Sequence, residues 1–216
     1  MGYDYIVVAN IINYSDSNEN FVRYGDDLVK YIREHQPTAE ILIHQTWAYE
    51  NNSPDVKFNE MYGGDRDAMY KSMKEKNAYA CDYFATLTTS DGTPVSLDGK
   101  PLRYLPSAEA FENASASDIF KTSHSGGSSW NTVHNYLQPD TTDEQGGNYI
   151  TLYRDSYHAS HHHGRYLVAL TWYRALTGKS VLENTYTNTR YPINEIARPI
   201  INAAAQKAVD DTGIWN

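Results

Sequence analysis

Blocks of apolar and polar residues along the chain predict strands and helices in succession. Residues 5–9 (Y-I-V-V-A) form a short apolar, β-branched run, which is typical of a strand buried on both faces. Residues 19–35 carry apolar side chains at helical spacing, and residues 40–47 (E-I-L-I-H-Q-T-W) form a second strand-like run. A strand, a helix and a strand with short connections predict a βαβ unit, and hence a parallel pair of strands. The helical positions are Phe21, Tyr24, Leu28, Tyr31 and Ile32.

The middle of the chain continues this alternation. We expect a long loop over residues 48–64, a helix over residues 65–87 and a third parallel strand over residues 102–105. Two Asp-Gly pairs make residues 88–100 rich in turn signals and indicate a small β-hairpin. A helix or helical turn begins within residues 106–114.

A well-patterned helix follows the extended segment 149–153 and the polar loop after it. Ser160 precedes the helical pattern as a candidate N-cap, and Gly178 stands where a glycine ends a helix. A final helix is predicted over residues 192–211, with Pro199 expected to kink or restart it. The apolar positions of the patterned helix are Tyr166, Leu167, Ala169, Leu170 and Tyr173.

Length and charge narrow the class of protein. A chain of 216 residues with 40% hydrophobic content suits a single α/β domain over residues 1–216. The net charge of -9 disfavours nucleic acid and anionic membranes as partners, because both bind basic surfaces. The run M-G-Y-D-Y-I-V-V-A-N lacks the basic and apolar regions of a signal peptide, so we expect none in these residues. Cys81 has no second cysteine to pair with, and its helix-like context favours a buried structural thiol.

The polar loop before the patterned helix carries the candidate chemistry. Asp155 and His158 are three residues apart in D-S-Y-H, a spacing that lets the carboxylate reach an imidazole nitrogen in the same loop. Such a pair fixes the imidazole tautomer and leaves the other ring nitrogen available to accept a proton. The structural alternative is a surface histidine that caps the following helix.

Three further patterns invite a ligand interpretation. His161, His162 and His163 are consecutive, and side chains at successive helical positions point about 100° apart, so we predict no metal site and no cofactor. Trp47 and Tyr49 fit either a sugar-stacking platform or ordinary core packing. The carboxylates of Glu50 and Asp55 form a weaker candidate for a glycosidase pair, which requires both groups to face one cleft.

Taken together, three segments resemble the SGNH (GDSL-like) hydrolase superfamily. They are I-H-Q-T-W-A-Y-E at residues 43–50, P-S-A-E-A-F at residues 106–111 and D-S-Y-H-A-S-H-H-H-G-R-Y-L-V-A-L-T-W-Y-R-A-L-T-G at residues 155–178. The likeness is to a bacterial branch marked by T-W-A-Y and a closing D-x-x-H, and it extends from Tyr3 to Gly178. It implies a flavodoxin-like three-layer sandwich with a mostly parallel sheet.

The resemblance also implies roles for individual residues. His158 corresponds to the general base of a serine hydrolase, and Asp155 to the carboxylate that orients it. Asn10 is the nearest candidate for an oxyanion donor. Gln45 and Trp47 lie at the end of the second predicted strand, at the sheet edge where open α/β folds bind ligands, so they are candidate substrate-binding residues. The implied substrate is a small-molecule or carbohydrate ester, such as an acetyl ester.

The sequence departs from the family at the nucleophile. It contains no G-D-S or G-N-S block and no G-x-S-x-G elbow, and its first strand corresponds to the family's third. We therefore expect a sheet that lacks the first strands, in an N-terminally incomplete domain whose strand 5–9 has an edge open to pairing with another chain. Two functions remain: an esterase, or a non-catalytic carbohydrate-binding or interaction domain. The alternative nucleophiles are the serines of T-S-H-S-G-G-S-S-W, namely Ser123, Ser125, Ser128 and Ser129.

Overall fold

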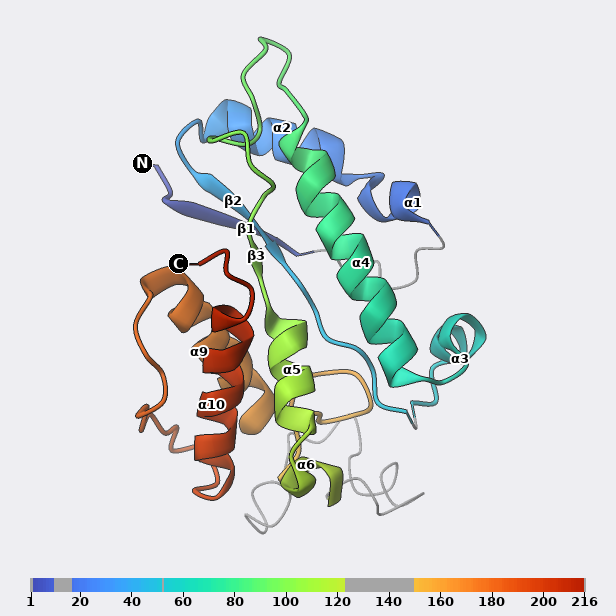
Figure 1. Cartoon of the computed structure of the whole chain (residues 1–216), viewed down its shortest axis with the longest axis vertical. Helices are drawn as coiled ribbons and strands as arrows, with labels where there is room; N and C mark the ends of the chain where they lie inside the picture. Colours follow the sequence, from blue (N-terminus) through green and yellow to red (C-terminus); the bar gives the residue numbers. More distant parts are fainter. Residues whose placement is uncertain (1, 10–16, 52, 123–149, 216) are drawn as a thin grey trace. The chain divides into compact units, whose positions relative to one another are not determined.

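The chain divides into two compact units (Figure 1). A computed structural model describes residues 2–9, 17–51, 53–122 and 150–215. Unit 1 comprises Met1–Ala48 and Asp55–Leu105, and unit 2 comprises Tyr49–Pro54 and Pro106–Asn216. The single domain over residues 1–216 stays a prediction.

Unit 1 contains a parallel three-stranded sheet. Its strands are β1 (Tyr5–Ala9), β2 (Glu40–His44) and β3 (Tyr104–Leu105), in the order β1-β2-β3. All five residues of β1 pair with β2 in parallel, and β3 pairs with the other side of β2, also in parallel. The α/β class and the parallel sheet predicted from the sequence are confirmed. The second strand is shorter than predicted because its partner β3 ends opposite His44, and the chain then enters helix α5 (Ser107–Ser115).

The described residues of unit 1 form the helices α1 (Asn18–Val22), α2 (Gly25–His35), α3 (Val56–Tyr62) and α4 (Arg66–Ala85). The helix predicted over residues 65–87 is confirmed as α4. The single helix predicted over residues 19–35 is wrong, because the chain turns between α1 and α2 and brings Gly25 against Phe84 of α4. A Cβ atom on Gly25 would lie 2.2 Å from the ring of Phe84.

Helix α3 lies within the stretch that the sequence predicted as a loop. Asp55 caps its N-terminus, since its side chain accepts a hydrogen bond from the backbone N–H of Phe58 at 2.8 Å. Gly63 ends the helix in the left-handed conformation, with a φ of 63°. The predicted loop is therefore wrong over these residues, where a short capped helix buries Phe58.

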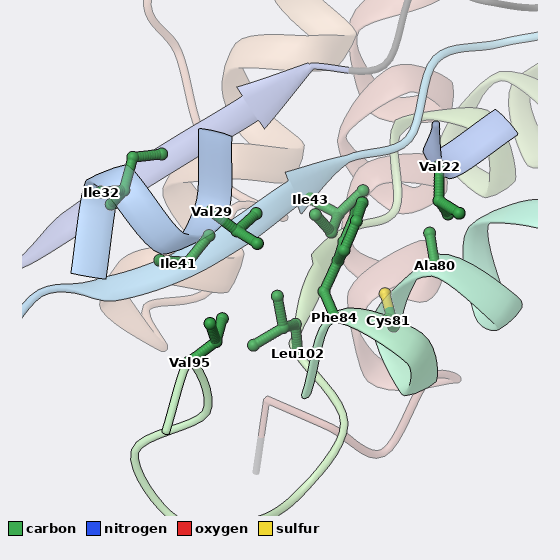
Figure 2. Close-up of a cluster of buried hydrophobic side chains, with 10 residues drawn as sticks. All are labelled: Val22, Val29, Ile32, Ile41, Ile43, Ala80, Cys81, Phe84, Val95 and Leu102. Atoms are coloured by element: carbon green, nitrogen blue, oxygen red, sulfur yellow. The ribbon is translucent and has the colours of Figure 1, made fainter. Parts of the chain in front are cut away.

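The core of unit 1 lies between the sheet and helices α2 and α4 (Figure 2). Val29 and Ile32 of α2 meet Ile41 and Ile43 of β2, and Phe84 of α4 packs among them. Cys81 is buried in this core, as predicted, and its burial together with the neighbouring carboxylate of Asp82 raises the pKa of the thiol to about 12. The full cluster is Val22, Val29, Ile32, Ile41, Ile43, Ala80, Cys81, Phe84, Val95 and Leu102.

The apolar stripe predicted for α2 does not coincide with its buried face. Ile32 is buried, but Tyr24, Leu28 and Tyr31 are 71%, 45% and 59% exposed. The buried face consists of Val29, Ile32 and Arg33. An aromatic and aliphatic stripe therefore remains on the surface of α2.

The turn-rich segment after α4 is a small hairpin, as predicted. Thr88 and Pro94 form an antiparallel bridge. Gly92 and Gly99 of the two Asp-Gly pairs have positive φ angles of 87° and 70°, which favour glycine. This segment also supplies the carbonyl of Val95, which binds the buried side chain of Arg33.

Unit 2 is helical, with α5 (Ser107–Ser115), α6 (Asp118–Thr122), α9 (His163–Thr177) and α10 (Ala197–Asp210). Helix α9 packs against α5 and α10, and Gly178 ends it with a φ of 68°, as predicted. The final helix begins at Ala197, so the predicted start at residue 192 is wrong. Pro199 lies in the first turn of α10, where backbone N–H groups have no acceptor within the helix. Its lack of an N–H therefore costs the helix no hydrogen bond.

Candidate functional site

The D-S-Y-H segment forms a tight loop in unit 2. Tyr153 and Ala159 form an antiparallel bridge across it, and the backbone N–H of Ser160 donates to the carbonyl of Leu152 at 2.8 Å. These contacts tie the two ends of the loop together directly before α9. Asp155 and His158 are thus held on a closed loop with an anchored base.

Asp155 makes three hydrogen bonds within this loop. Its Oδ1 accepts from the backbone N–H of Tyr157 at 3.0 Å and of His158 at 2.6 Å. Its Oδ2 lies 2.7 Å from Nδ1 of His158. With the carboxylate ionised, Nδ1 carries the proton and Nε2 is the basic nitrogen of the imidazole. The predicted pairing of Asp155 and His158 is present, with the carboxyl side chain 14% exposed and the imidazole 40% exposed.

A cationic side chain flanks this pair. Nε of Arg154 lies 3.7 Å from Oδ2 of Asp155, and its Nη1 lies 3.4 Å from Nε2 of His161. The guanidinium group of Arg154 thus lies beside both Asp155 and His161. The sequence pattern did not single out Arg154.

Residues 49–54 support the loop from a distant part of the chain. The backbone N–H of Glu50 donates to the carbonyl of Ser156 at 2.9 Å, and the Ser156 hydroxyl donates to Oγ of Ser53 at 2.9 Å. The rings of Tyr49 and Tyr157 lie 5.2 Å apart. Ser53 and Ser156 are buried and 103 residues apart in the sequence, so no local pattern could have identified this contact.

Ser160 connects the loop to α9. Its Oγ accepts from the backbone N–H groups of His163 at 3.2 Å and Gly164 at 2.9 Å, and it donates to the carbonyl of Thr151 at 2.7 Å. Ser160 thus caps the first turn of α9, as predicted, although two turn residues separate it from the start of the helix.

The three consecutive histidines have different neighbours. The ring of His161 lies 5.0 Å from that of Tyr191, Nδ1 of His162 is 2.8 Å from the carbonyl of Pro192, and Nε2 of His163 accepts from the backbone N–H of Asn194 at 3.3 Å. Within residues 2–9, 17–51, 53–122 and 150–215, no three His, Cys, Asp or Glu side chains are placed to hold a metal ion.

The buried imidazole of His163 should make the protein sensitive to acid. Burial, together with the adjacent His162, lowers the pKa of His163 from 6.5 to about 4. Since the unfolded chain takes up this proton near pH 6.5 and the folded chain only near pH 4, stability falls as the pH drops between these values. The loss approaches about 3 kcal/mol.

This loss can be measured by urea unfolding near pH 7 and near pH 4.5. The free energy of unfolding should fall less between pH 7 and pH 4.5 in His163→Gln than in the wild type, because the buried imidazole is gone. The control His35→Gln, at an exposed histidine, should show the same fall as the wild type. An unchanged pH dependence in His163→Gln would contradict the assignment.

The other predicted site residues lie in unit 1 or outside the described residues. Gln45 follows β2 in unit 1, is 1% exposed, and its backbone N–H donates to the carbonyl of Leu105 at 3.2 Å. Trp47, also in unit 1, is half-buried, with its ring 6.4 Å from that of His44. Asn10 lies outside the described residues. So do Ser123, Ser125, Ser128 and Ser129.

The residues of the predicted glycosidase pair and of the predicted sugar-stacking platform make contacts within their own units. The carboxylate of Asp55 caps α3 in unit 1, whereas Glu50 belongs to the segment that supports the D-S-Y-H loop in unit 2. Tyr49 contacts Tyr157 in that same unit. In both interpretations, one of the two residues belongs to unit 1 and the other to unit 2.

Among the helices in the described part of the chain, none has both the length and the apolar character needed to cross a bilayer.

Comparison with solved structures shows a likeness in fold. A crystal structure of a DUF4886 family protein from Bacteroides uniformis is similar to this chain, with a TM-score of 0.68 and 25% sequence identity. The match covers 99% of this chain and 65% of that chain, so this chain spans about two thirds of the length of that protein. No protein-family model matches the chain, and no curated protein does either. The designation DUF4886 names no activity or ligand.

Proposed function

We propose that this chain is an SGNH-like ester hydrolase, in which His158 is the general base and Asp155 is the carboxylate that orients it. The observation that supports this most strongly is the contact of 2.7 Å between Oδ2 of Asp155 and Nδ1 of His158. Two backbone N–H groups fix the other carboxylate oxygen, so the imidazole is held in one orientation and one tautomer.

The proposed reaction is acyl transfer through a serine. Nε2 of His158 takes the proton of a serine hydroxyl as its oxygen attacks the ester carbonyl carbon, and Asp155 stabilises the resulting imidazolium. The tetrahedral intermediate then collapses, and the imidazolium returns the proton to the departing alkoxide. A water molecule, deprotonated by the same imidazole, hydrolyses the acyl-serine and regenerates the hydroxyl group.

The remaining roles follow the same resemblance. Asn10 is proposed as a donor to the oxyanion, and Gln45 and Trp47 as substrate-binding residues. The proposed substrate is a small-molecule or carbohydrate ester, of which an acetylated sugar is the simplest case. The proposed nucleophile is a serine hydroxyl, which chemical labelling followed by peptide mapping would locate.

A second function is a binding or interaction domain without catalysis. The observation that favours it is the sequence itself, which contains no G-D-S, G-N-S or G-x-S-x-G segment to present a nucleophile. In this alternative, the Asp155–His158 pair has a structural role, which is to hold the loop before α9 in shape.

Ester hydrolysis by the purified chain distinguishes the two functions. We expect hydrolysis of p-nitrophenyl acetate and of acetylated oligosaccharides, and His158→Ala should reduce kcat/KM by at least about 10³-fold, because it removes the base. Asp155→Asn should reduce it strongly as well, since the amide no longer stabilises the imidazolium. His35→Ala, on the exposed surface of α2, serves as the matched control and should retain activity.

Two results would contradict the proposal. One is hydrolysis that persists in His158→Ala with an unchanged kcat/KM. The other is a folded wild-type chain that binds acetylated oligosaccharides and hydrolyses neither substrate, which would favour the binding domain.

A further inference from the structure

Arg154 lies directly beside the proposed catalytic pair. Its backbone N–H donates to the carbonyl of His158 at 3.0 Å, and its Nε lies 3.7 Å from Oδ2 of Asp155, the same oxygen that binds Nδ1 of His158. The guanidinium group and the imidazole are therefore adjacent around one carboxylate oxygen. The side chains of Arg154 and His158 are 32% and 40% exposed, so a molecule that reaches the imidazole can also reach the arginine.

A second arginine lies further along the same part of unit 2. Nη1 of Arg154 donates to Nε2 of His161 at 3.4 Å, and the ring of His161 lies 5.0 Å from that of Tyr191. The guanidinium carbon of Arg190 lies 5.2 Å from the centre of the Tyr191 ring. Arg154, His161, Tyr191 and Arg190 thus form a continuous series of contacts that starts beside the proposed base, and these four residues are called the arginine row below.

The outer end of the arginine row is held by the chain around it. The backbone N–H of Tyr191 donates to Oδ1 of Asn188 at 3.2 Å, and the ring of Tyr191 lies 5.3 Å from that of His162. Nδ1 of His162 lies 2.8 Å from the carbonyl of Pro192. Because these contacts tie the segment to the start of α9, the row is formed before any ligand binds.

We propose that the arginine row binds a carboxylate of the ester substrate, which is therefore an O-acylated acidic sugar; this inference rests on the proposed hydrolase function. A guanidinium group has five N–H donors in a planar fork that matches a carboxylate, and it can bind more than one acceptor at a time. In this arrangement, the ester group lies at Nε2 of His158, and a carboxylate of the same or the next sugar unit lies at Arg154. Arg190 attracts the acidic chain further from the base.

The charges favour a ligand with one negative charge on each anionic group. The two arginines carry two positive charges and Asp155 offsets one of them, so this surface keeps a net positive charge in a chain whose overall charge is -9. Local positive charge beside a catalytic base attracts anionic substrates. Asp155 would repel a phosphate dianion more strongly than a carboxylate, since the repulsion grows with the charge of the ligand. A carboxylate therefore fits this surface better than a phosphate.

Hydrolysis of an acidic and of a neutral substrate tests the arginine row. Acetylated oligogalacturonides carry carboxylates, whereas acetylated xylo-oligosaccharides are neutral, and we expect the wild type to have the higher kcat/KM with the acidic substrate. Arg154→Gln should lower the ratio of the acidic to the neutral kcat/KM by about tenfold or more, which is the scale of a lost charge-assisted hydrogen bond. Arg154→Lys keeps the charge and should retain part of the preference. The control Lys179→Gln, which removes the same charge after the far end of α9, should keep the wild-type ratio.

A change at the outer end of the row leaves the loop of Asp155 and His158 as it is. Arg190→Gln should lower the same ratio about two- to threefold, as expected for an exposed charge, and added salt should weaken the preference of the wild type. Arg190 is on the surface, so this variant decides the question even if Arg154→Gln does not fold.

The ratio separates substrate binding from a purely structural role of Arg154. An equal loss with both substrates in Arg154→Gln, or a wild type without preference for the acidic substrate, would overturn the inference and leave the hydrolase function intact.

A wild type that folds but hydrolyses neither substrate nor p-nitrophenyl acetate would instead refute the hydrolase function. The arginine row is then tested by binding: unesterified oligogalacturonides should shift the NMR signals of the His158 and His161 rings in the wild type and not in Arg154→Gln. Unshifted signals in the wild type would overturn the arginine row as well.

Discussion

Replacing Gly164 with alanine should destabilise unit 2 and displace the loop of Asp155 and His158. Gly164 lies in the first turn of α9, and a Cβ atom there would be 2.2 Å from the carbonyl oxygen of Leu152 and 3.0 Å from Cβ of Ala159. The same carbonyl accepts the hydrogen bond from Ser160 that closes the loop, so it cannot withdraw without breaking that bond. We expect a loss of about 2 to 3 kcal/mol, despite the better helix propensity of alanine.

The same substitution at the other end of α9 is the control. Gly178 has open space around its Cα, and Gly178→Ala should cost only about 1 kcal/mol, from its positive φ of 68°. Urea unfolding gives both stabilities, and the NMR signal of the His158 ring reports on the loop. If Gly164→Ala matches the wild type in both measurements, the close contact with Leu152 is not a constraint on the site.

Replacing Arg33 with methionine should destabilise unit 1 by about 3 to 5 kcal/mol. Arg33 is 1% exposed, and its five hydrogen bonds all go to backbone carbonyl groups. Its Nε and Nη2 donate to Val95 in the hairpin, at 3.0 Å and 2.7 Å. Its Nη1 donates to the carbonyls of Gln36, Pro37 and Ala39 after α2.

The cost arises because methionine would remove the guanidinium donor from four partly buried carbonyl groups, of which that of Gln36 keeps a hydrogen bond from the backbone N–H of Ala39. Arg33→Lys should cost less, because an ammonium group can satisfy some of these carbonyls but not in the fork geometry of a guanidinium group. Arg23→Met, at an exposed arginine, should change stability by less than about 0.5 kcal/mol. A change of less than about 1 kcal/mol in Arg33→Met would show that these hydrogen bonds are replaced by water.

The parts of the fold that could be predicted are those with strong local patterns. The runs at residues 5–9 and 40–44 are continuous and apolar, and such runs are recognisable as buried strands without knowledge of their neighbours. Helix α9 was predicted because Ser160 and Gly178 mark its two ends. Helix α3 was missed because its one buried residue, Phe58, provides no periodicity.

Which side of a helix is covered could not be predicted from periodicity alone. In α2, Tyr24, Leu28 and Tyr31 have the same helical spacing as a buried stripe, and yet they are exposed. Arg33 is buried instead, because a segment 62 residues further along the chain supplies a carbonyl acceptor. Tertiary partners of this kind leave no trace in a local pattern.

In the candidate site too, local contacts could be predicted and contacts between distant segments could not. The contact of Asp155 with His158 was predictable because both residues lie in one short loop. The hydrogen bond between Ser53 and Ser156 was not, since it joins segments that are distant in the sequence. The roles of Asn10, Gln45 and Trp47 rest on resemblance and stay predictions.

Fluorophosphonate labelling of the folded chain, read by intact mass, asks directly whether His158 activates a serine hydroxyl. These reagents modify a serine that a nearby base activates. We expect one adduct per chain in the wild type, and its loss in His158→Ala but not in His35→Ala. Peptide mapping of that adduct would identify the nucleophile. No adduct on the folded wild-type chain, or an adduct that His158→Ala retains, would show that His158 does not activate a serine.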